Sequence, residues 1–204
     1  KTSSDAIVLG AVTLANPTTI DTDATNNNGD ITIGIVTGSG QNFAMETGNN
    51  IAGADITASG AISNVATLIL DNVGGTATFS GDVDVNALDV DNTVANLALT
   101  GNGSTITSNF TPSNDGTLVL GDASGDTLTF NGGITESTTG TVTLSGSIVS
   151  SNDAINFGPI TLGADTTINS AGGSIVTGNI TGTSGQDITI TSTGGSTTTA
   201  LTNG

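Results

Sequence analysis

The chain has 204 residues and a formal net charge of −17, and it contains no Cys, His, Trp or Tyr. Lys1 is its one basic residue, so the sequence offers no imidazole base, thiolate nucleophile, zinc-binding set or internal Lys or Arg. We therefore expect no enzymatic activity, no nucleic-acid partner and no membrane insertion, since phosphate binding needs Lys or Arg and no apolar stretch approaches the ~20 residues of a membrane helix.

The first predicted element, residues 6–15, is the most apolar stretch of the chain and reads Ala-Ile-Val-Leu-Gly-Ala-Val-Thr-Leu-Ala. An open strand edge templates pairing with another strand, and head-to-tail contacts that do not close give fibres. We interpret residues 1–15 as a strand segment that caps the core or joins one subunit to the next. The side chains predicted to make this joint are Ile7, Val8, Leu9, Val12 and Leu14.

Short segments that read apolar-Thr-apolar follow along the chain. They are residues 31–33, 77–79, 128–130, 142–144 and 188–190, and the second of them begins with Ala as its first apolar residue. A period of two predicts strands with one buried face and an outward Thr.

No stretch shows a helical stripe. The nearest, residues 85–99, is interrupted by Asp89-Val-Asp91-Asn-Thr, so we predict two strands and a turn there. Disorder is the alternative that the Gly and polar content permits, but charged residues make up only 9% and mean hydropathy is +0.16, which favours a folded chain.

A degenerate module recurs with the form apolar-Thr-(Phe or Leu)-x-Gly-x-(Ile or Val). Its copies are residues 77–83, 128–134 and 142–148, with a shortened form at 155–160. The Phe or Leu is expected to stack inside successive coils while the Gly turns the corner. Imperfect internal repeats of this kind are typical of stacked arrays. The sequence therefore predicts an all-β, single-domain parallel β-helix, or β-solenoid, over residues 1–204.

Residues 154–176 read Ala-Ile-Asn-Phe-Gly-Pro-Ile-Thr-Leu-Gly-Ala-Asp-Thr-Thr-Ile-Asn-Ser-Ala-Gly-Gly-Ser-Ile-Val. This stretch resembles the repeats of large secreted bacterial β-helix proteins, which include filamentous-haemagglutinin-like and autotransporter-like adhesins. The likeness extends from about Gly29 to the end. It implies a right-handed helix that is extracellular or displayed on a bacterial cell surface.

The densest acidic segment places Asp82, Asp84, Asp89 and Asp91 at spacings of two within each pair. Each pair is expected to share an outward face, where its carboxylate oxygens would bind Ca²⁺, the one cofactor that the sequence suggests. The alternative is a solvated face that prevents aggregation. Two further acidic segments, residues 21–30 and 121–128, are explained more simply as loops of Asn, Asp and Gly.

The sequence leaves several functions open. The leading hypothesis is a non-enzymatic extracellular structural protein, either a self-associating filament subunit or an adhesin stalk segment. Its partner would be a second copy, joined head to tail, or a cell-surface or matrix ligand. One alternative is a ligand-binding adhesin. Another is an ice-binding solenoid that uses Thr-x-Thr pairs, which begin at Thr76, Thr105, Thr127, Thr141 and Thr189.

Overall fold

In the computed structural model, residues 5–23, 29–48, 51–182 and 185–201 are described. They form 21 strands and no helix, so none of these residues belongs to a helix that could cross a membrane. The strands are β1 (Ile7–Leu9), β2 (Val12–Thr13), β3 (Thr18–Asp21), β4 (Ile31–Ile33), β5 (Val36–Thr37), β6 (Phe43–Glu46), β7 (Ile56–Ala58), β8 (Ile62–Leu70), β9 (Thr76–Phe79), β10 (Val83–Val90), β11 (Asn96–Leu99), β12 (Thr105–Ile106), β13 (Leu118–Leu120), β14 (Thr127–Phe130), β15 (Ile134–Thr135), β16 (Val142–Ser150), β17 (Ile155–Phe157), β18 (Ile160–Asn169), β19 (Ile175–Gly182), β20 (Ile188–Thr191) and β21 (Thr197–Leu201).

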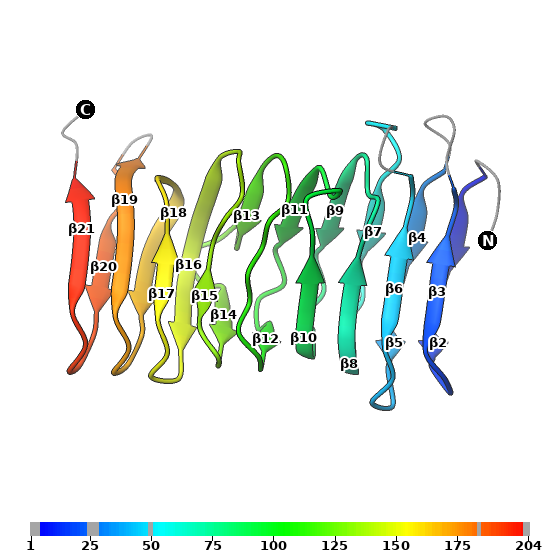
Figure 1. The fold of residues 1–204 in the computed structure, drawn as a ribbon, viewed down its shortest axis with the longest axis horizontal. Helices are drawn as coiled ribbons and strands as arrows, with labels where there is room; N and C mark the ends of the chain where they lie inside the picture. The colour runs from blue at the N-terminus through cyan, green and yellow to red at the C-terminus, as the bar shows by residue number, and fades with distance from the viewer. Residues whose placement is uncertain (1–4, 24–28, 49–50, 183–184, 202–204) are drawn as a thin grey trace.

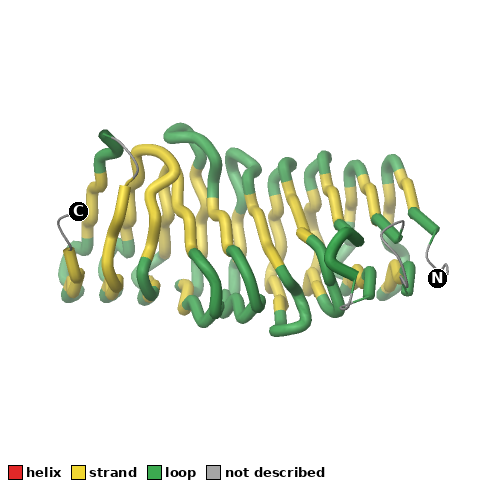
Figure 2. The backbone as a smooth tube through the Cα atoms, turned by 90° about the horizontal axis from the view of Figure 1, so that it is seen from above, coloured by secondary structure: helices red, strands yellow, loops and turns green. Residues whose placement is uncertain are grey.

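Every described strand pairing is parallel, and each strand pairs with strands of the coil before or after it. The result is a β-solenoid of about nine turns, as the sequence predicts. Figures 1 and 2 show the coils following one another along the long axis, with the two termini at opposite ends. The right hand implied by the resemblance stays a prediction.

The strands form three stacks along the solenoid. The first begins with β1, β4 and β7, the second with β2, β5 and β8, and the third with β3, β6 and β8. Long strands bend around a corner and contribute to two stacks. In β10, Asp84 pairs with Ser63 in the second stack while Asp89 pairs with Ile69 in the third.

The core is a set of apolar rows that run along the solenoid axis. In the first stack one such row contains Ile7, Ile31, Ile56, Ala77, Leu97, Leu118, Val142, Ile160 and Ile180. From Ile31 to Leu118 every member of this row is 0% exposed. Each coil thus buries its few apolar side chains against its neighbours, which is how a chain with so few aromatic residues fills a core.

The recurring module does not occupy one fixed place in the turn. Phe79 and Leu144 lie in the first stack, Phe130 in the second and Phe157 in the third. All four are buried, so the prediction that they point inward is confirmed. The module, however, can occur at any corner where one strand ends and the next begins. The module does not recur at a constant spacing because the number of residues in one solenoid turn varies. The turn from Val142 to Ile160 spans 18 residues, and that from Ile31 to Ile56 spans 25.

A column of glycines forms the corner between the first and second stacks. It contains Gly10, Gly34, Gly60, Gly81 and Gly101. A Cβ on Gly34 would lie 2.5 Å from the Gly10 O, and one on Gly101 would lie 2.5 Å from the Gly81 O. Side chains are excluded because the backbones of successive coils touch here.

Candidate functional site

The four aspartates predicted to bind Ca²⁺ lie on two different faces. Asp82 and Asp84 flank the buried Val83 on the second stack, and Asp89 and Asp91 flank the buried Val90 on the third. Each pair therefore points outward as expected, but the bend in β10 separates the pairs. No three acidic side chains gather into a group that could hold a metal ion within the part of the chain that the structure describes.

Two of these carboxylates already accept hydrogen bonds from the backbone. Asp82 Oδ1 lies 2.8 Å from the Gly103 amide nitrogen of the next coil, and Asp91 Oδ1 lies 2.8 Å from the Thr93 amide nitrogen. Asp84 and Asp89 are exposed on their strands. The Asp82 contact joins two successive coils and the Asp91 contact stabilises a turn within one coil, and Ca²⁺ binding at either pair stays a prediction.

The two other acidic segments behave as loops where the structure describes them. Asp126 is 5% exposed, and its Oδ2 accepts the Asp122 and Ala123 amide hydrogens at 2.8 and 2.9 Å. Desolvation, a side-chain hydrogen bond with Asp126 and repulsion between the two carboxylates raise the pKa of Asp122 above 3.8. Residues 24–28 of the segment 21–30 lie outside the described residues.

The first coil presents an open strand edge. Among the described residues, β1 pairs with β4 alone, β2 with β5 alone and β3 with β6 alone. Ile7, Leu9 and Val12 are only partly buried, although the next members of their rows are 0% exposed. A further coil would cover these three side chains.

Val8 and Leu14, the other two side chains predicted to join subunits, are not partly buried at the edge. Val8 is 74% exposed on the outer face of β1. Leu14 is 2% exposed and already belongs to the core, so it is not available at the edge. Residues 1–4 of the predicted joining segment lie outside the described residues.

The Thr-x-Thr pairs do not share one face, because Thr78 and Thr143 lie in the first stack whereas Thr105, Thr129 and Thr191 lie in the second. The first stack nevertheless carries an outward row without charge. Its members are Val8, Thr32, Thr57, Thr78, Ala98, Val119, Thr143, Thr161 and Thr181. Two runs of three threonines are therefore in register, separated by Ala98 and Val119.

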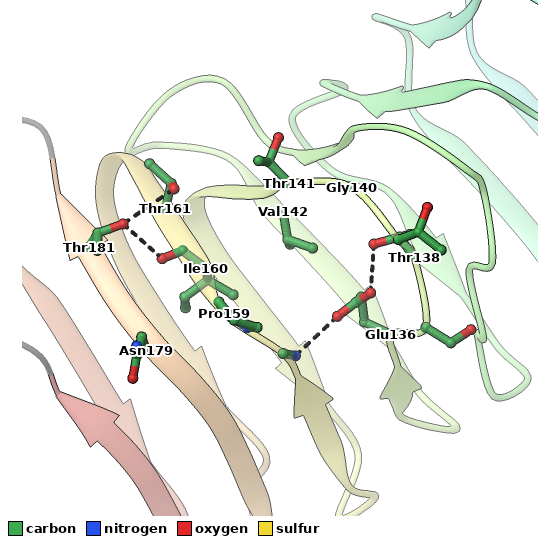
Figure 3. A pocket seen from close by; sticks show the side chains of 13 residues that line it. Glu136, Thr138, Gly140, Thr141, Val142, Pro159, Ile160, Thr161, Asn179 and Thr181 are labelled. Atoms are coloured by element: carbon green, nitrogen blue, oxygen red, sulfur yellow. Dashed lines mark hydrogen bonds between the residues drawn. The ribbon is translucent and has the colours of Figure 1, made fainter.

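A groove of about 560 Å³ lies in the C-terminal half of the solenoid, and we call it the Glu136 groove. It is lined by residues 136–142 and 158–161 together with Asn179 and Thr181 (Figure 3). Sequence reasoning missed it. The signal available in the sequence was the unequal length of successive solenoid turns. The turn from Leu118 to Val142 takes 24 residues, whereas the next one, from Val142 to Ile160, takes only 18.

No protein-family model, curated protein or solved structure matches the chain.

Proposed function

We propose that this protein is a non-enzymatic structural solenoid that associates end to end, as a filament subunit or as a segment of an adhesin stalk. The observation that carries the proposal is the open edge of the first coil, where Ile7, Leu9 and Val12 lie partly exposed in otherwise buried rows. Unpaired backbone groups beside uncovered apolar side chains favour the addition of another strand.

The partner that fits this edge is the far end of a second copy. At that end, among the described residues, β20 pairs with β18 alone and β21 with β19 alone, and Ile188 and Ile190 are partly buried. The first and last described coils thus both carry parallel strands of the same solenoid. A contact between the first coil of one copy and the last coil of another is heterologous and does not close, so repeated contacts of this kind build a fibre.

The absence of thiols and imidazoles, and of any Lys or Arg besides Lys1, supports a passive role, because carboxylates, hydroxyls and amides are almost all that remains for chemistry. The resemblance of residues 154–176 to secreted bacterial β-helix repeats supports a place outside the cell or on its surface. A net charge of −17 keeps such a surface soluble and repels anionic lipid and nucleic acid.

We expect the purified chain to form unbranched fibres in electron micrographs and to scatter light as particles far larger than 19.7 kDa. Because the subunits repel one another, fibre formation should increase from low salt to 0.15 M NaCl, where the Debye length is about 8 Å. If residues 1–15 make the joint, their truncation should abolish the fibres, and unaffected assembly would place the contact elsewhere.

Leu9→Asp tests the edge more sharply, because it places a charge in the uncovered row and leaves the other coils unchanged. The matched control is Thr57→Asp, which adds the same charge to an exposed position in the middle of the first stack. Only Leu9→Asp should prevent fibres. A chain that stays monomeric at every salt concentration contradicts end-to-end association. If both variants lose fibre formation equally, the contact between subunits lies elsewhere.

Ice binding is a second candidate, favoured by the in-register run of Thr32, Thr57 and Thr78 in an outward row without charge. It predicts thermal hysteresis in concentrated solution. Thr57→Lys should reduce the hysteresis because it interrupts the row, whereas Thr107→Lys, exposed outside this row, should not. Absence of hysteresis in the unmodified chain removes this candidate.

A further inference from the structure

The Glu136 groove arises from unequal corners between the third and first stacks. Residues 136–141 connect β15 to β16, whereas only Gly158 and Pro159 connect β17 to β18 in the next coil. Both corners line the groove, the longer one with all six of its residues. Val142 and Ile160, each 2% exposed, form its apolar floor.

Glu136 is held in a fixed orientation at one end of this groove (Figure 3). Its Oε2 accepts the Gly158 amide hydrogen at 3.0 Å, and its Oε1 accepts the Thr138 hydroxyl at 2.6 Å. Each carboxylate oxygen keeps further lone-pair capacity for a ligand. The carboxylate is therefore preorganised, which lowers the entropy lost on binding.

No cationic group of the described residues balances this carboxylate, because Lys1 is the one basic residue of the chain and lies outside them. The groove therefore disfavours anionic ligands. It also lacks an aromatic platform for sugars: the five phenylalanines are the chain's only aromatic residues, and none is more than 4% exposed.

We propose that the Glu136 groove binds an alkylammonium group, as carried by a lysine side chain or by a polyamine. The ammonium donates to Glu136 and to neighbouring Thr hydroxyls, in charge-assisted hydrogen bonds. The methylene groups contact the Pro159 ring and the apolar floor, as lysine stems do on other protein surfaces. This proposal stands whether or not the chains associate end to end.

The test is an NMR titration of the ¹⁵N-labelled protein with two probes, spermidine and Nα-acetyl-lysine methylamide. We expect a saturable shift of the Gly158 amide, whose hydrogen bonds to Glu136. Spermidine binding alone identifies a polyamine site, and binding of the lysine derivative identifies a site for a lysine side chain. If neither probe shifts Gly158 saturably, the proposal is wrong.

Glu136→Gln keeps the shape of the side chain and removes its charge, and we expect it to weaken binding about tenfold. The matched control Asp187→Asn removes one charge from an exposed position outside the groove, and it should change the affinity less than twofold. Equal weakening in the two variants would show only diffuse attraction to an acidic protein and would overturn the site.

A second variant leaves Glu136 and its hydrogen bonds intact. Asn179 is exposed and lines the groove, so Asn179→Lys places a competing ammonium there. We expect weaker probe binding with an unchanged fold. Unchanged affinity would contradict the proposal independently of any effect of Glu136→Gln on folding.

Discussion

Replacing Phe79 by alanine is expected to lower the free energy of unfolding by about 4 kcal/mol, the range of a large buried side chain deleted from a rigid core. Phe79 is 0% exposed and lies between Ala58 and Leu99 in a row of the first stack. Because a coil contacts only its neighbours, the cavity weakens two successive interfaces. Urea unfolding followed by circular dichroism measures the change.

Val176→Ala is the control for this variant, since Val176 is 41% exposed on the third stack. We expect a change within about 0.5 kcal/mol, as for most surface positions. If the two variants destabilise the protein equally, the inward row that contains Phe79 is wrongly placed.

The glycine corner predicts a second large effect. A Cβ on Gly101 would lie 2.5 Å from the Gly81 O and 2.7 Å from the Gly81 C, so alanine there forces two backbones apart. We expect Gly101→Ala to cost about 3 kcal/mol, because a rigid backbone cannot yield as a flexible side chain does.

Gly125→Ala is the matched control, because nothing lies within 4 Å of a Cβ at this position and its φ is not in the left-handed region. We expect it to be neutral or stabilising by up to about 1 kcal/mol, since alanine restricts the unfolded chain. Thermal denaturation of both variants measures the difference, and a stable Gly101→Ala protein would contradict the close contact between coils.

Much of the fold was predictable because the relevant signals are local. The alternation in residues 31–33 and 142–144 depends only on strand geometry, and both segments are strands with buried apolar and outward Thr side chains. The interruption at Asp91 likewise marks the end of β10. The grouping of strands into three stacks was not predictable, because turns of unequal length give the module no constant register.

The candidate sites show the same limit. The outward direction of Asp82 and Asp84 follows from the period of two, but their separation from Asp89 and Asp91 depends on the bend of β10, for which the sequence shows no Gly or Pro. The Glu136 groove depends on the difference between two successive corners. Unequal turn lengths hint at such a difference, but the groove itself becomes visible only when the rows of both coils are aligned in space.

The measurement that tests end-to-end association most directly is an electron micrograph of the native material. A solenoid whose first and last coils join should appear as continuous, unbranched filaments or as stalks of uniform width on a cell surface. Isolated short rods, in native material and in purified protein alike, would contradict association through the edge formed by β1 and β2.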